Sequence, residues 1–309
     1  MGRFKSLLTA VVAMTALMWS ADLFAQTRAV RLTRYQGDAL SGVSVASGFK
    51  VELSQGTATS AIVEVNEELE KYLIFENRNG IVTLYFSSDA QNELSRLRKR
   101  GTLHLVAHVV AERITAVKSS SGSRVCINTD VDENDFSLTV SSGSSVKASD
   151  VRANIVKFNV ASGAAAEVGN VDASRTDVVV SSAGRFRSGD VNSDRLQINI
   201  ASGSSASIEK LVSRYVEMVA SSSSRISISS GTAEECTING ASGSRISCES
   251  LEAGKAKVVL ASGSGSTLSV KDTLDISVSS AAVFTYYGIP AIVGNNVASG
   301  GRVSQHSAR

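Results

Sequence analysis

The sequence predicts an all-β protein, a right-handed parallel β-helix: a solenoid of about ten coils of roughly 20 residues each, with a β-hairpin cap near the N-terminus. Three observations predict this fold. A triplet of small residues recurs along the chain, aliphatic residues keep a fixed spacing from it, and only 5% of residues are aromatic. Three cysteines are too few for a disulfide-dense scaffold, so burial of the 43% hydrophobic residues must supply stability.

The repeat is marked by triplets such as Ser141-Ser142-Gly143, whose third residue we call the anchor. The anchors are Gly122, Gly143, Gly163, Ala183, Gly203, Ser223, Gly243, Gly263, Ala281 and Gly300. Successive anchors lie 21, 20, 20, 20, 20, 20, 20, 18 and 19 residues apart. This regular spacing predicts a repeat architecture with one coil for each step. We expect the triplet at a corner, where glycine readily adopts a positive φ.

Hydrophobic side chains keep phase with the anchors. They lie seven, five and three residues before an anchor (Val156, Phe158, Val160) and three, five and eight residues after one (Val146, Ala148, Val151). Alternation with period two is typical of strands with one buried face. A single coil cannot bury that face, but stacked coils can, and parallel crossovers are generally right-handed. An antiparallel sandwich would not keep this register, and a leucine-rich repeat would need a leucine-dominated code that the chain lacks.

Residues 1–25 have the layout of a secretory signal peptide. Arg3 and Lys5 form a positive n-region, Leu7 to Trp19 is an uncharged apolar run, and Ala25 is a small residue suited to cleavage. A transmembrane anchor is the alternative, but this run is short for a bilayer, and no later stretch is apolar enough to cross one. We therefore expect export to the periplasm, the outer-membrane surface or the extracellular space.

Removing the signal peptide changes the formal charge balance from 31 − 29 = +2 to 29 − 28 = +1. A nearly neutral chain has no large field for gathering phosphate polymers, which argues against nucleic acid as a partner.

Residues 26–110 are expected to form an N-terminal coil and a cap. The segment from Val43 to Leu53 looks like one more coil, and strands are expected between residues 61 and 86. The turn Asn77-Arg78-Asn79-Gly80 predicts a tight hairpin. The charged stretch from Glu93 to Arg100 is expected to be a solvated loop or a short helix.

Residues 111–303 are expected to form the repeat body together with a C-terminal cap. Phe284, Tyr286 and Tyr287 bring aromatic side chains into a chain that has few, and we assign them to the cap with Gly288-Ile289-Pro290. Residues 304–309, which include His306, are expected to be a frayed tail.

Taken together, these features resemble the bacterial "putative auto-transporter adhesin, head GIN domain" family. The likeness is carried by Val43–Gln55 with Ala61–Phe86, by the Ser-Gly-Ser repeats from Ser121 to Ser264, and by Tyr286–Pro290 with Ser299-Gly300. The resemblance implies an exported right-handed parallel β-helix with a proposed role in adhesion. It implies no catalytic residues, so no site can be carried over to this chain.

Few residues suggest chemistry. His104 and His108 lie in a segment that reads as a strand, where residues four apart are more than about 12 Å from each other, so we favour plain strand surface over a metal site. Cys236 and Cys248 fall at inward positions and are expected to be buried thiols, with a disulfide as the alternative. Cys126 falls at an outward position.

Polar residues recur at two further positions. Seven residues after successive anchors lie Asp150, Asn170 and Asp190, and nine residues after them lie Arg152, Asp172 and Asn192. Stacking would bring these side chains together on one edge. One hypothesis is a Ca²⁺ site formed by Asp150, Asn170, Asp172 and Asp190; the alternative is a hydrated edge in which Arg152 offsets the acidic charge.

Three functions fit the predicted fold. The first is a non-enzymatic binding module at the cell surface or in the periplasm, with a glycan or a cell-surface protein as its partner and no cofactor. The second is a polysaccharide lyase or hydrolase, and the third a purely structural envelope protein. Coil lengths vary by at most three residues from Gly122 onward, which leaves no long loops to wall a catalytic groove and favours binding.

Overall fold

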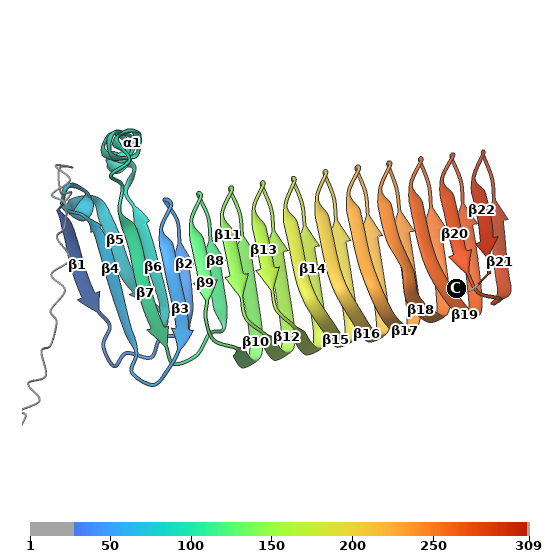
Figure 1. Cartoon of the computed structure of the whole chain (residues 1–309), viewed down its shortest axis with the longest axis horizontal. Helices are drawn as coiled ribbons and strands as arrows, with labels where there is room; N and C mark the ends of the chain where they lie inside the picture. The colour runs from blue at the N-terminus through green and yellow to red at the C-terminus, as the bar shows by residue number, and fades with distance from the viewer. Residues whose placement is uncertain (1–27, 308–309) are drawn as a thin grey trace, which may run out of the picture.

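The computed structural model describes residues 28–307, which form a rod of stacked β-coils (Figure 1). The predicted signal peptide, residues 1–25, lies outside the described residues. Twenty-two strands join into one continuous sheet that winds around the rod. The predicted parallel β-helix is therefore confirmed. No helix within residues 28–307 is long and apolar enough to cross a membrane.

The elements follow in a simple order. The N-terminal part contains β1 (Ala29–Arg34), β2 (Gly42–Val45), β3 (Lys50–Gln55), β4 (Ser60–Asn66), η1 (Glu67–Tyr72), β5 (Leu73–Arg78), β6 (Ile81–Phe86), η2 (Ser88–Ala90), α1 (Gln91–Arg100) and β7 (Leu105–Ala111). The body contains β8 (Ala116–Ser119), β9 (Arg124–Ile127), β10 (Val131–Val140), β11 (Ser145–Ala148), β12 (Val151–Val160), β13 (Ala165–Val168), β14 (Val171–Val180), β15 (Arg185–Ile200), β16 (Ser205–Ala220), β17 (Arg225–Gly240), β18 (Arg245–Leu260) and β19 (Gly265–Val278). The C-terminal end contains β20 (Val283–Tyr287), β21 (Ala291–Val297) and β22 (Arg302–His306).

One coil consists of a long strand, a tight turn, a short strand and a corner, as in β12 and β13. Buried and outward residues alternate along β12, except that Asn154 and Ile155 both lie outside the core. β12 pairs in parallel with β14, with Val151 opposite Val171 and Val160 opposite Val180. Each paired residue of β12 therefore stacks on the residue 20 positions later.

The inward side chains form one column along the rod. Val156, Phe158 and Val160 are each at most 1% exposed, as their spacing from the anchor predicts. The ring of Phe158 packs between those of Phe136 and Phe186, with ring centroids 6.3 Å and 4.9 Å away. Because every coil contributes to the same column, burial is shared between neighbours rather than completed within a coil.

The anchors lie in turns whose two central residues have positive φ. In one coil these are Ser162 (φ 54°) and Gly163 (φ 71°), the pattern of a type I′ turn. The Gly163 N–H donates to the Ser182 carbonyl of the next coil at 2.9 Å, so the turns are linked along the rod. The anchors Ala183, Ser223 and Ala281 adopt the same conformation without being glycine, with φ of 61°, 59° and 60°.

The irregular steps are absorbed at corners. The 21-residue step places its extra residue between Ile127, which pairs with Ala148, and Val131, which pairs with Val151. The 18-residue step shifts the register between β18 and β19 on either side of Ala253.

The N-terminal part contains the predicted coil and the predicted hairpin. β2 pairs in parallel with β6 and β8, and β3 pairs in parallel with β7 and β9, so this coil continues the column. β5 and β6 form the antiparallel hairpin, with positive φ at Asn79 and Gly80. β1 and β4 pair antiparallel and close this end. The charged stretch is helix α1, which buries Leu94 and Leu97.

The C-terminal end differs from the prediction. Phe284 and Tyr286 do not close the column; they lie three and five residues after the anchor Ala281, at ordinary core positions, and are 0% and 8% exposed. One more coil, β21 and β22, follows them. β22 includes His306, which lies beside the ring of Tyr287 at a centroid distance of 5.6 Å. The expectation of a frayed tail is therefore wrong for residues 304–306, because β22 pairs with β20 through His306.

Candidate functional site

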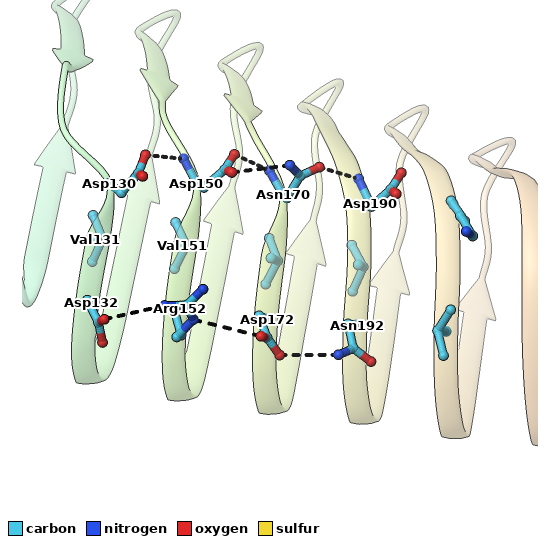
Figure 2. A pocket seen from close by; sticks show the side chains of 14 residues that line it. Asp130, Val131, Asp132, Asp150, Val151, Arg152, Asn170, Asp172, Asp190 and Asn192 are labelled. Carbon is cyan, nitrogen blue, oxygen red and sulfur yellow. Dashed lines mark hydrogen bonds and ion pairs between the residues drawn. The ribbon is translucent and has the colours of Figure 1, made fainter.

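The first row of polar residues, which we call the first ladder, consists of Asp130, Asp150, Asn170 and Asp190 (Figure 2). The first three residues each accept a backbone N–H from the next coil. The Asn170 N–H donates to Asp150 Oδ1 at 2.7 Å, and the Asp190 N–H donates to Asn170 Oδ1 at 3.0 Å. The Asp150 N–H donates to Asp130 Oδ1 at 3.3 Å. A short side chain with an acceptor oxygen satisfies amides that the corner leaves outside the sheet pairing.

Two glycines make room for the first ladder. A Cβ on Gly169 would overlap Asp150 Oδ1, and a Cβ on Gly189 would lie 2.7 Å from Asn170 Oδ1. Neither glycine has a positive φ, so the requirement is space and not backbone conformation. These glycines were not recognised as part of the site from the sequence, although each directly precedes a ladder residue.

The second ladder consists of Asp132, Arg152, Asp172 and Asn192, each two residues after a member of the first ladder (Figure 2). Arg152 lies between two carboxylates, 3.6 Å from Asp132 Oδ2 and 3.8 Å from Asp172 Oδ2. Asn192 Nδ2 donates to Asp172 Oδ1 at 3.3 Å. The ionic side chains are 58–74% exposed, so each pair adds little to stability and remains available to a ligand.

A groove of about 440 Å³ runs between the two ladders, and we call it the ladder groove. Between the ladders it is lined by Val131, Val151, Val171 and Val191, which are core residues at most 2% exposed, and at its far end by Lys210 and Val212. The lining contains five aspartates against Arg152 and Lys210, a formal charge of 2 − 5 = −3. The groove crosses successive coils, so it presents carboxylates and amides from coil to coil, with Arg152 among them.

The structure brings three of the four residues of the calcium hypothesis into the first ladder and places Asp172 in the second. Asp150 and Asn170 each use one side-chain oxygen to accept an N–H from the next coil. Across residues 28–307, no group of three or more His, Cys, Asp or Glu side chains has the arrangement of a metal site. The calcium hypothesis stays a prediction.

The model of the "putative auto-transporter adhesin, head GIN domain" family matches residues 39–211 and 186–290, which together include both ladders. The chain belongs to this family. The matched segments also include the predicted hairpin and most of the repeat body.

Solved structures similar to this GIN-domain chain share little sequence with it. A "putative adhesin" from Parabacteroides distasonis is 13% identical, with 91% of this chain and 98% of that chain covered and a TM-score of 0.50. A "putative adhesin" from Parabacteroides merdae is also 13% identical, with 91% and 97% covered and a TM-score of 0.47. No curated protein matches the chain. At this identity the likeness concerns the fold alone.

The cysteines of the GIN-domain chain lie apart from the ladders. Cys236 and Cys248 are buried and both are free, so the alternative of a disulfide is not what the structure has. Burial raises the pKa of the Cys236 thiol to about 12 and raises the pKa of Cys248 as well. The Cys248 Sγ lies 3.9 Å from Met218 Sδ. Cys126 is half-buried, consistent with its outward position.

The two histidines do not share a ligand. His104 Nε2 lies 3.3 Å from Glu64 Oε2, and His108 Nδ1 lies 3.3 Å from Glu52 Oε2. His108 is in strand β7, as the sequence predicted, whereas His104 lies directly before that strand.

One buried carboxylate was missed from the sequence. The side chain of Glu133 is only 3% exposed, and its Oε2 accepts hydrogen bonds from Arg113 Nε at 2.8 Å and Nη2 at 2.6 Å. Its Oε1 accepts the Ile114 N–H at 3.2 Å. The hydrogen bonds to Glu133 raise the pKa of Arg113. The carboxylate is fully engaged, so it joins the first body coils to the N-terminal part and is not free for chemistry.

Proposed function

We propose that this chain is an exported, non-catalytic, adhesin-like binding module whose ladder groove takes a segment of a glycan or of a cell-surface protein. The observation that supports this most directly is the groove itself, an exposed channel to which each coil from Asp130 to Asn192 contributes two polar side chains. An extended ligand could meet a polar group of each coil at about 4.8 Å intervals, the spacing of neighbouring strands.

The rigidity of the site supports binding rather than turnover. The first ladder is fixed to the backbone by amide hydrogen bonds, so its oxygens are held in place before a ligand arrives, which lowers the entropy lost on binding. The formal charge of −3 favours a ligand that is neutral or basic along the groove. Membership in a family described as adhesins agrees with this function.

Glycan-array and whole-cell binding assays on the purified protein test the proposal. The variant D132N/D172N removes two groove carboxylates that cap no backbone amide, so we expect an unchanged fold and at least tenfold weaker binding. The matched control is E167Q/E217Q, which removes two exposed carboxylates from other faces, one of them paired with Lys147 at 3.6 Å. Equal binding by both variants would remove the groove from the proposal, and no binding to any glycan or cell would favour a scaffold.

Two further measurements address export and catalysis. N-terminal sequencing of protein recovered from the envelope or medium should start at Gln26 if the signal peptide is cleaved after Ala25. Incubation with pectin or a glycosaminoglycan should give no unsaturated ends. Appearance of such ends would make the chain a lyase and contradict the non-catalytic function.

A further inference from the structure

The C-terminal end of the rod is open, unlike the N-terminal end. Among residues 28–307, β21 pairs only with β19 and β22 pairs only with β20, whereas body strands such as β14 have a partner on each side. The outer edges of β21 and β22 therefore present unpaired backbone N–H and C=O groups within the described chain. At the opposite end of the rod, antiparallel strands β1 and β4 cover the column (Figure 1).

Exposed hydrophobic side chains gather at this open end. Five of the eight large exposed hydrophobic residues in the described chain are Val283, Ile289, Ile292, Val293 and Val297, and Ile289 and Val293 are 89% and 68% exposed. Ile292 and Val297 pair with Leu274 and Val278 of the preceding coil, which are completely buried. They are core residues that lack the next layer.

The edge strand β21 carries no charged residue, and the nearest charged residue after it is Arg302 of β22. No Asp, Glu, Lys or Arg occurs from residue 276 to residue 301, in a chain that is 19% charged. Proteins normally protect free sheet edges with charged side chains, particularly lysine. The edge β21 lacks this protection, whereas β1 at the other end carries Arg31 and Arg34.

We propose that the C-terminal end binds a second copy of the chain, end to end, with β21 antiparallel to its own copy about a twofold axis near Gly294. A twofold axis brings identical side chains together, so charged edges repel and an uncharged edge does not. Pairing would satisfy the free backbone N–H and C=O groups of β21 in both copies and cover Ile292, Val293 and Val297 in each copy. Within the described chain, an uncharged apolar edge strand occurs at this end, which makes the end complementary to itself.

The proposal is independent of the ladder groove, which lies in the coils of β10 to β16. It is tested by light scattering and sedimentation of the purified protein across micromolar concentrations. The expected result is a species of twice the monomer mass. The variant V293K places like charges across the axis at a residue already 68% exposed, and should weaken the dimer about 100-fold. The control V179K alters a valine that is 42% exposed in the middle of the rod and should leave the dimer intact.

Charge complementation identifies the occupant. V293K and V293E should each be monomeric alone, and a mixture of the two should form a heterodimer. A monomeric wild-type protein would overturn the proposal, because the end would then be free or reserved for another protein. A dimer that V293K does not weaken would place the contact elsewhere and overturn it equally.

Discussion

Replacing Gly169 by alanine tests whether the first ladder is built into the fold. The new Cβ would overlap Asp150 Oδ1 and come within 3.1 Å of the Asp150 backbone nitrogen. Asp150 would have to release the Asn170 N–H, which it now accepts at 2.7 Å. Overpacking costs about 1–3 kcal/mol, and a hydrogen bond to a charged group contributes about 1.5–3 kcal/mol when buried. Because this ladder is exposed, water replaces part of the lost bond, and we expect a total loss of about 2–3 kcal/mol.

A double-mutant cycle separates the overlap from other effects. In the D150A background the overlapping oxygen is absent, so G169A should cost about 1 kcal/mol or less, and the two changes should couple by about 1–2 kcal/mol. Chemical unfolding followed by circular dichroism measures each free energy of unfolding. G163A is the control, because a Cβ on Gly163 meets no atom within 4 Å and only the backbone strain at φ 71° remains. A G169A protein as stable as wild type, or an equal cost with and without Asp150, would refute the reasoning.

Three other predictions follow from the turns, the thiols and the calcium hypothesis. A183G should raise the free energy of unfolding by about 0.5–1 kcal/mol, because removing the Cβ relieves the strain of a left-handed residue (φ 61°) by more than the added entropy of the unfolded chain costs. Thermal unfolding measures this difference, and a loss of stability would contradict it. In native protein at pH 8, a thiol reagent should label Cys126 and not Cys236 or Cys248. Burial raises the pKa of Cys236 from 9.0 to about 12, so between these pH values the thiol ionises only in the unfolded chain. The free energy of unfolding should therefore fall as pH rises through that window, and C236A should lack this part of the pH dependence. If the ladders bind Ca²⁺, millimolar calcium should raise the Tm of the wild type but not of D150N, and an unchanged Tm would end the hypothesis.

The column could be predicted from the sequence because its period repeats. Core positions such as Phe158 follow from the anchor spacing, since one buried face and a fixed coil length leave a single register. The same rule places Phe284 and Tyr286 in the core, but because aromatic residues are rare in this chain, these two suggested a cap instead. Once they join the column, the coil after them becomes the exposed end.

The contacts at the corners were harder to predict, because nothing in the sequence pattern shows how closely neighbouring coils approach there. The ladder positions follow from the 20-residue step, but the sequence does not show that Asp150 accepts the amide of Asn170. The role of Gly169 depends on that contact. Glu133 was missed because it occupies an inward position, where a carboxylate is tolerated only with partners such as Arg113, which lies 20 residues earlier.

The uniform 20-residue step makes the interior coils interchangeable, because each touches only the coil before and the coil after it. Duplicating or deleting one whole interior coil would change the reach of the molecule by about 4.8 Å and leave both termini as they are. Loss of a single residue within a strand would instead turn the outward side chains inward. The length of the rod can thus change only by whole coils.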